Sequence, residues 1–165
     1  MKAALDVHYE SGMSVAACVV FDNWQDNEPA DLIRAIVRGA SGYRAGRFYE
    51  RELPCLISVL QKAYRGFDTI IIDGYVHLKP ETGKGLGTYL FESLPYSTVV
   101  IGVAKNPLTI ADQFVPIFRG RSRKPLFVSA IGCQAEQAAR SILSMHGPYR
   151  IPTLLKLADR HARAD

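Results

Sequence analysis

Four carboxylates in separate segments have the types and positions expected of a metal-dependent nuclease. Asp6 follows the apolar start of ALDVHY, and Asp73 follows the apolar run of TIIIDGY. Glu52 ends the segment 43–52, and Asp159 lies in KLADRHAR. Mg²⁺ prefers hard oxygen ligands, and a bound Mg²⁺ can activate water and offset the charge that develops on a phosphate. A single Asp at a strand end more often caps a turn, so only the combination supports a phosphodiester-cleaving site.

Hydrophobic patterning predicts the elements that must bring these carboxylates together. The sequence begins with two β-rich stretches joined by Glu10-Ser11-Gly12, which predicts a hairpin. The segment 32–37 fits either a helix or a buried third strand. Further strands are expected at 69–72, 98–103 and 125–130, and helices at 53–63, 134–145 and 151–162, the last with Pro152 in its first turn. This order predicts an α/β fold with a mixed β-sheet flanked by helices.

If Asp6 and Asp73 end neighbouring central strands, their carboxylates meet at one edge of the sheet. Two such groups repel each other unless a cation lies between them. The loop Gly83-Lys84-Gly85-Leu86-Gly87 follows no clear strand and lacks the downstream pattern of a P-loop, so we interpret it as a turn before a helix containing Tyr89. The chemistry is therefore expected at the carboxylates.

Length and composition fit one globular domain over residues 1–165, of which 48% are hydrophobic. A net charge of +4 is compatible with a polyanionic partner. Three cysteines without close Cys-x-x-Cys spacing predict neither a disulfide framework nor a structural zinc site, which favours a reducing cytoplasm. Neither a signal peptide nor an apolar run that could span a bilayer is present, so no membrane partner is expected.

The chain resembles the endonuclease V family in the ordered segments DVHY, YRAGRFYERELP, IIIDGYVH, IGVAKNPL, LFVS and YRIPTLLKLAD. The resemblance covers almost the whole chain as far as Ala162. It implies a ribonuclease H-like core and hydrolysis, dependent on Mg²⁺ or Mn²⁺, of a phosphodiester 3′ to a deaminated purine such as inosine, leaving 3′-hydroxyl and 5′-phosphate ends. The chain starts almost at its first strand, so we expect it to lack the helical segment that precedes this strand in many members.

The resemblance also implies roles for individual positions. Asp6, Glu52 and Asp73 match metal ligands, with Glu52 in the Arg-Glu pair that opens a helix, and Asp159 would assist a second cation or its water. Lys105 matches a lysine near the scissile phosphate, where its charge can stabilise the transition state. His77 occupies a downstream histidine position and is expected to contact the phosphate or orient water.

Nucleic-acid contacts are expected from a loop and from basic groups. Tyr43 and Gly46 match a loop that inserts beside the extruded base, where tyrosine offers a stacking face and glycine permits close approach of the main chain. Gly74, directly after Asp73, is assigned to the same contact. The arginines Arg44, Arg47 and Arg51, and the later group Arg119, Arg121, Arg123 and Lys124, could guide the phosphate backbone, although half of them are expected to be ordinary solvated side chains.

Several positions depart from the family pattern and leave the target open. Gly42 and Arg44-Ala45 flank Tyr43 where the family usually has prolines, and Tyr75-Val76 stand where smaller residues are common. The alternatives to an inosine-directed enzyme are a related nuclease with a mismatched, branched or single-stranded target, and a nucleic-acid-binding relative with weak or no catalysis. Both DNA and RNA remain possible partners, and a monomer is expected.

Overall fold

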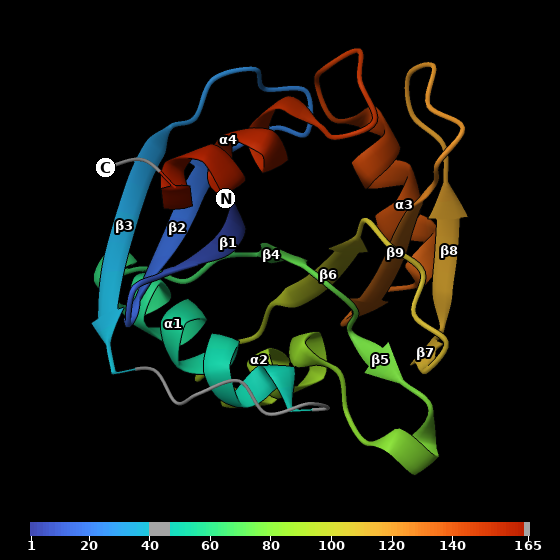
Figure 1. Ribbon diagram of the computed structural model, residues 1–165. Coiled ribbons are helices and arrows are strands. Elements are labelled where there is room, and N and C mark those ends of the chain that lie inside the picture. The colour runs from blue at the N-terminus through green and yellow to red at the C-terminus, as the bar shows by residue number, and fades with distance from the viewer. Residues whose placement is uncertain (40–46, 164–165) are drawn as a thin grey trace.

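The computed structural model describes residues 1–39 and 47–163, leaving aside the side chain of Phe48. In this part of the chain a mixed seven-stranded sheet has the order β3-β2-β1-β4-β6-β9-β8, and helices cover both of its faces (Figure 1). The central pairs β1·β4 and β4·β6 are parallel, and the remaining pairs are antiparallel. The sheet is therefore of the mixed α/β kind that the sequence predicts.

The bounds of the strands and helices follow the chain order. The strands of the main sheet are β1 (Lys2–Glu10), β2 (Met13–Phe21), β3 (Asp31–Arg38), β4 (Thr69–Asp73), β6 (Val99–Ala104), β8 (Phe114–Ile117) and β9 (Leu126–Ile131). A small second sheet pairs β5 (His77–Leu78) with β7 (Ala111–Asp112). The helices are α1 (Phe48–Ala63), the 3₁₀ turn η1 (Pro80–Thr82), α2 (Leu86–Ser93), α3 (Ala135–Ser144) and α4 (Thr153–Arg163).

The ambiguous segment 32–37 is a strand, β3, and its side chains alternate. Ile33, Ala35 and Val37 pack into the core under α1, whereas Leu32 and Ile36 are 41% and 60% exposed. This period of two identifies a half-covered edge strand rather than a helix. The predicted hairpin of β1 and β2 is confirmed, with its turn at Ser11 and Gly12, both of positive φ.

Two hydrophobic cores lie on opposite faces of the sheet. The buried run of β4 supplies both, because Ile70 and Ile72 face the core under α1 and α2 while Ile71 faces the core under α3 and α4. A strand covered on both faces has no polar side to show, which explains its continuous apolar sequence. In the described residues no helix is long and apolar enough to cross a membrane.

Two helix starts differ from the sequence prediction, and one strand at the sheet edge is additional to it. Helix α1 begins at Phe48 rather than Leu53, so Glu52 lies in its second turn and does not open it. Its early start is supported by an ion pair of 2.9 Å between Arg47 and Glu50. Helix α4 begins at Thr153, and Pro152 lies just before it with its carbonyl accepting from the Lys156 N–H at 2.9 Å. Strand β8, which contains Pro116, was not predicted; it lies at the sheet edge, where proline is tolerated.

Candidate active site

Strand register places Asp6 and Asp73 side by side. In the parallel pair of β1 and β4, Leu5 pairs with Ile72, so the next residue of each strand is a carboxylate on the same face. Asp73 ends β4 as predicted. Asp6 does not end β1, which continues to Glu10 in pairing with β2, and it is instead the first residue beyond the pairing with β4. The sheet thus presents both carboxylates at the point where these two strands part.

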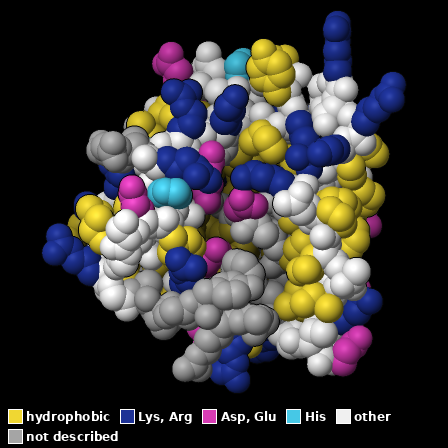
Figure 2. All heavy atoms as spheres, viewed as in Figure 1, with side chains coloured by type: hydrophobic (Ala, Val, Ile, Leu, Met, Phe, Trp, Pro, Cys, Tyr) yellow, Lys and Arg dark blue, Asp and Glu magenta, His cyan; other side chains and the backbone are white. Residues whose placement is uncertain are grey.

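Helices α1 and α4 add the other two carboxylates. Glu52 of α1 and Asp159 of α4 line, with Asp6 and Asp73, one polar pocket of about 160 Å³. Lys105, just after β6, and Arg163 of α4 line the same pocket. Figure 2 shows Asp and Glu side chains in a hollow near the middle of this face, with Lys and Arg side chains along its upper rim. The four carboxylates that stand apart in the sequence therefore share one cavity.

Burial and mutual repulsion shift two of these carboxylates strongly. Burial, then the charge of Asp73, raises the pKa of Asp6 from its ordinary 3.8 to about 6. Burial, then the charges of Asp73 and Asp6, raises the pKa of Glu52 from 4.5 to about 7. Both groups gain protons more readily because burial disfavours their charged forms, and the neighbouring carboxylates add to this effect. Such shifts in a cavity are typical of functional sites.

Two cationic side chains of the protein, Lys105 and Arg163, form ion pairs with carboxylates of this pocket. The Lys105 Nζ lies 2.7 Å from Asp73 Oδ2, with both side chains about two fifths exposed. Burial alone would lower the pKa of Lys105, but the hydrogen bond and charge of Asp73, together with Asp6 and Asp159, hold that pKa above its usual value. Arg163 Nε donates to Asp159 Oδ1 at 2.8 Å. These pairs partly neutralise Asp73 and Asp159, and leave Asp6 and Glu52 without a comparable partner among the described residues.

The donor set fits a divalent cation of the Mg²⁺ kind. It consists of carboxylate oxygens only, and it surrounds a polar cavity large enough for an ion with its waters. Two of its members have raised pKa values, first because they are buried and then because other carboxylates lie close to them. In the arrangement that the described residues adopt, no three Asp, Glu, His or Cys side chains are grouped so as to hold an ion as they stand. The ion pairs of Asp73 and Asp159 explain this, since a cation would have to replace Lys105 and Arg163 there.

Glu52 is packed against an aromatic residue that the sequence did not single out. The Arg51 guanidinium lies 3.4 Å from the centre of the Tyr9 ring. Burial, then the charge of the nearby Glu52, raises the pKa of the Tyr9 hydroxyl, whose oxygen is buried. Arg51 therefore packs beside the site as a stacked cation and is not a free phosphate contact.

Gly74 gives the backbone after Asp73 a conformation that side chains avoid. Its φ is +137°, and a Cβ there would point into open space. From the other side, a Cβ on Gly102 of β6 would lie 2.4 Å from the Gly74 carbonyl oxygen. Tyr75 and Val76, expected as bulky neighbours of a base pocket, are buried elsewhere: the Tyr75 hydroxyl donates to Asn106 O at 2.8 Å, and Val76 packs under α2.

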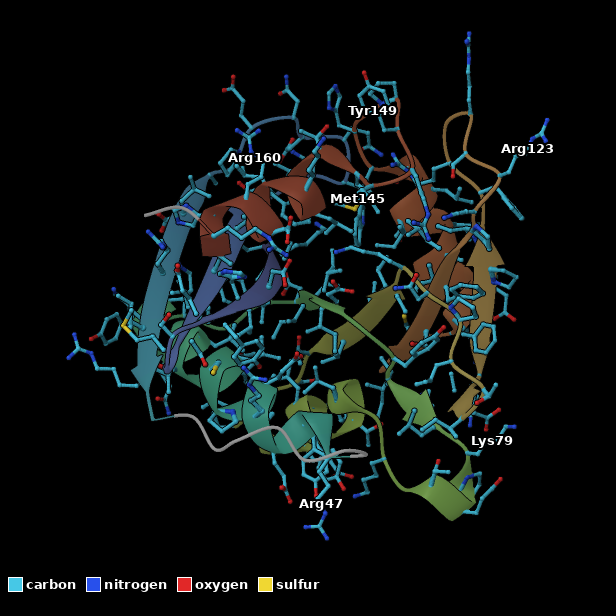
Figure 3. All side chains as sticks on the ribbon, in the orientation of Figure 1. Arg47, Lys79, Arg123, Met145, Tyr149 and Arg160 are labelled. Atoms are coloured by element: carbon cyan, nitrogen blue, oxygen red, sulfur yellow. The ribbon has the colours of Figure 1, made fainter. Side chains whose placement is uncertain are left out.

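Other expected site residues lie apart from the carboxylates. His77 does not line their pocket; its Nε2 lies 2.8 Å from Ala130 O, and it borders a different cavity. Arg47 is paired with Glu50 and points away from the pocket, and Arg123 extends outward on the β8–β9 loop that also carries Arg121 (Figure 3). Tyr43, Arg44 and Gly46 lie outside the described residues.

Two arginines have structural tasks that the sequence did not reveal. Arg119, expected as a phosphate contact, is 6% exposed and donates to backbone carbonyls of the 145–150 loop. Arg150 donates to the carbonyls of Lys105 and of Pro125, which fixes the backbone that carries the Lys105 side chain. These contacts span 25 to 45 residues, so no local pattern could have shown them. Arg163, by contrast, follows Asp159 by four residues, a spacing that does predict an ion pair on a helix.

Comparison with known proteins agrees with the geometry. A family model described as Endonuclease V matches residues 1–160. No curated protein matches the sequence significantly. Among solved structures, endonuclease V from Streptomyces avermitilis is 26% identical, with a TM-score of 0.78 over 98% of this chain and 78% of that one.

Two other structures extend the likeness. Endonuclease V of Ciona intestinalis, in complex with a 24mer DNA that contains an inosine followed by a ribo-adenosine, is 20% identical with a TM-score of 0.78, over 98% of this chain and 84% of that one. The Bacillus subtilis enzyme is 21% identical with a TM-score of 0.76, over 98% of this chain and 78% of that one. The expected ribonuclease H-like α/β core is confirmed by these structures. The chain belongs to the endonuclease V family and is an endonuclease that acts on phosphodiester bonds.

Proposed function

We propose that the protein hydrolyses a phosphodiester bond 3′ to a deaminated purine, inosine in the first instance, in DNA or RNA, with Mg²⁺ as cofactor and Mn²⁺ as a possible substitute. One observation carries the proposal: Asp6, Glu52, Asp73 and Asp159 line a single polar pocket together with Lys105. The similarity to a Ciona structure that holds inosine-containing DNA supports the choice of base. The protein would act as a monomer with one domain, in a reducing cytoplasm.

Each carboxylate has a role that follows from its place. Asp6, Glu52 and Asp73 would hold the metal, and Asp159 would assist a second ion or its water. When bound, the metal would supply an activated water and offset charge developing on the phosphate. Because the pKa values of Asp6 and Glu52 are raised to about 6 and about 7, protons would compete with the metal for these two ligands more strongly than for ordinary carboxylates.

Lys105 is proposed to stabilise the phosphate during reaction. Its ammonium contacts Asp73 in the lining of the pocket. The hydrogen bond from Arg150 to the Lys105 carbonyl holds the backbone that carries this side chain. Once Asp73 has another partner, the ammonium is free to donate to a phosphate oxygen. Water oxygen adds to phosphorus, the bond from phosphorus to O3′ breaks, and O3′ takes up a proton, leaving 3′-hydroxyl and 5′-phosphate ends. His77 takes no part in this scheme, since it does not line the pocket.

Gly74 is proposed to admit the base. Its positive φ and the open space at its Cβ position leave the main chain after Asp73 accessible to a planar ligand. Tyr43 and Gly46 would complete this contact as the inserting loop. Arg44, Arg47, Arg121 and Arg123 would guide the phosphate backbone through their charge.

A changed target is the second candidate, and the sequence of the inserting loop favours it. Gly42 and Arg44-Ala45 stand beside Tyr43 where the family usually has prolines, which predicts a looser and more basic loop. A mismatched, branched or single-stranded substrate would suit such a loop.

Cleavage of a matched substrate panel tests the proposal. Single-stranded and duplex oligonucleotides of DNA and of RNA, with and without one inosine, are incubated with Mg²⁺ or Mn²⁺ and with wild-type or Asp6→Asn protein. We expect cutting 3′ to inosine, dependent on metal and lost in Asp6→Asn while binding is kept. Equal cutting without inosine, or preference for a mismatched or branched strand, would replace inosine with a changed target, and binding without cutting under every condition would contradict the proposed catalysis.

A further inference from the structure

A second pocket adjoins the carboxylate site and is absent from the scheme above. It has a volume of about 260 Å³ and is lined by Tyr149, Arg150, Ile151, Leu155 and Lys156, together with Lys105 and Asp159, which also line the carboxylate pocket. A narrow space of about 20 Å³ shares Ile151 and Leu155 with this pocket and Asp6 and Asp73 with the other. A strand whose phosphate lies at Lys105 would therefore continue directly into it.

The loop that carries Tyr149 is held unusually firmly by a buried arginine. Arg119 donates through Nη2 to Met145 O at 2.6 Å and to Gly147 O at 3.2 Å, and through Nη1 to Tyr149 O at 2.7 Å and to Arg150 O at 3.3 Å. Four carbonyls of one loop are thus fixed by a single planar group. The chain also packs closely here, since a Cβ on Gly120 would lie 2.4 Å from Pro148 O.

This fixed loop presents its aromatic side chain to solvent. Tyr149 is 71% exposed, whereas Met145 of the same loop is 4% exposed, and Figure 3 shows Tyr149 at the surface above Met145. An exposed ring adds little to core stability, but a ring on an immobile backbone binds a planar ligand with little loss of conformational entropy. Every nucleobase offers a face that stacks on such a ring.

The charges around the pocket suit a phosphate on its far side. Arg150 is committed to the carbonyls of Lys105 and Pro125. Lys156, one turn into α4, is exposed and has no ion pair within the described part of the chain. The pocket therefore combines an aromatic face, the apolar side chains of Ile151 and Leu155, and one uncommitted cation.

We propose that this pocket is a subsite for the nucleotide next to the scissile phosphate, with its base stacked on Tyr149, its sugar against Ile151 and Leu155, and its outer phosphate at Lys156. The inference rests on the proposed function in one respect, that the substrate strand lies with its reacting phosphate at Lys105. It requires neither inosine nor a particular metal. Stacking of this kind is independent of sequence, so the subsite contributes affinity and alignment rather than base specificity.

Binding of oligonucleotides shortened one nucleotide at a time from either end tests the subsite. Fluorescence anisotropy in the presence of a chelator separates binding from cleavage. We expect Tyr149→Ala to weaken binding of the full-length strand about tenfold, Tyr149→Phe to leave it unchanged, and Lys156→Ala to weaken it less and in a salt-dependent way. Tyr64→Ala is the matched control, because Tyr64 is 93% exposed at the far end of α1 and should have no effect.

The length series decides between a subsite and a general effect. The loss in Tyr149→Ala should vanish for strands shortened from one end past the position that reaches the pocket, and persist for strands shortened from the other end. Equal loss at every length, loss in Tyr64→Ala, or wild-type binding by Tyr149→Ala would overturn the proposal. If inosine preference fails while the loss follows strand length, the proposed target is wrong and the subsite stands.

Discussion

At the scale of single residues, the site is defined by an excess of buried negative charge. Asp6 and Glu52 are protonated more readily than ordinary carboxyls, because burial and, for each of them, two neighbouring carboxylates disfavour the charged form. Lys105 is the cation nearest to Asp73, and its position at the pocket mouth suits contact with a substrate phosphate. Lys105 thus balances the charge of Asp73 in the free protein, and the proposed function gives the same ammonium a second role at the phosphate.

Replacing Lys105 should damage catalysis far more than stability. Because the Lys105–Asp73 pair is about two fifths exposed on both sides, it contributes no more than about 1 kcal/mol to the free energy of unfolding. Loss of a charge aimed at the transition state commonly reduces kcat by about 10²- to 10³-fold. We therefore expect Lys105→Met to show such a loss in single-turnover cleavage with an almost unchanged Tm. Lys105→Arg, which keeps the charge, should retain part of the rate, and full activity in Lys105→Met would exclude the assigned role.

At the scale of elements, the site depends on the close approach of β4 and β6 behind Asp73. Gly102 of β6 leaves room for the Gly74 carbonyl, which directly follows the carboxylate. Hydrogen bonds from two arginines hold other parts of the backbone near the site. Arg119 fixes the loop before α4, and Arg150 fixes the backbone of Lys105. The chemistry is carried by few side chains, but the backbone contacts between neighbouring elements set their positions.

Gly102→Ala should therefore impair both folding and turnover. The added methyl would meet the Gly74 oxygen at 2.4 Å and the Ser129 Oγ at 2.9 Å, so the backbone after Asp73 must move. We expect a loss of about 1–3 kcal/mol in denaturant unfolding and a fall in kcat of up to about 10²-fold. Gly66→Ala is the matched control, since its methyl would meet only the Tyr96 ring at 3.4 Å, an ordinary contact. Equal behaviour of the two variants would show that the β4–β6 contact does not position Asp73.

Local patterns predicted the elements whose side chains are buried in a regular way. The apolar runs of β4 and β6 and the β1–β2 hairpin were predicted within one or two residues. Periodicity alone could not assign β3, because the apolar residues at 32, 33, 36 and 37 have the spacing of a helical face and are also compatible with a buried strand. In the structure Ala35 lies between Ile33 and Val37 on the buried side, which gives the strand period of two. The early turns of α1 were missed because the prediction followed the apolar helical face, which begins at Leu53, whereas the helix begins at Phe48 and continues through Pro54.

The candidate site was predicted less evenly. Sheet geometry predicted that Asp6 and Asp73 meet, and they do so through the register of β1 and β4, although only Asp73 ends its strand. Glu52, Asp159 and Lys105 were assigned through the family resemblance, and all five residues line one pocket. His77, although close to Asp73 in sequence, lies on the separate strand β5 with Nε2 beside the Ala130 carbonyl, and its predicted contact with the phosphate stays a prediction. The structural role of Arg119 and the position of Tyr149 could not be predicted, because they depend on a hydrogen bond between residues distant in sequence.

At the scale of the whole molecule, the carboxylate cluster links stability to pH and to metal. The pKa values of Asp6 and Glu52 are raised in the folded state, so between about pH 4 and pH 7 the native protein keeps protons that the unfolded chain has released. The stabilisation from these groups is therefore complete at low pH and is lost as the pH rises through this window. A divalent cation held as proposed would need the deprotonated carboxylates, so its stabilising effect should grow over the same window.

Chemical unfolding across this pH range checks the linkage. In a chelator, the free energy of unfolding of wild type should fall by roughly 2–5 kcal/mol more than that of an Asp6→Asn/Glu52→Gln variant, given about 1.4 kcal/mol for each unit of pKa shift. Mg²⁺ should restore much of the loss at the upper end of the range in wild type and little in the variant. Parallel pH profiles for the two proteins would show that these carboxyls titrate as in an unfolded chain.

The carboxylate pocket of Asp6, Glu52, Asp73 and Asp159 is proposed as the centre of metal-dependent strand cleavage. Single-turnover cleavage of one inosine-containing strand, with Mg²⁺ titrated from zero, by wild type and by Asp73→Asn, tests this directly when strand affinity is measured in parallel. We expect no wild-type cutting in a chelator, a rate that saturates with Mg²⁺, and a rate for Asp73→Asn lower by about 10³-fold or more at nearly unchanged affinity. Cutting in the chelator, or a wild-type rate in Asp73→Asn, would contradict the proposal.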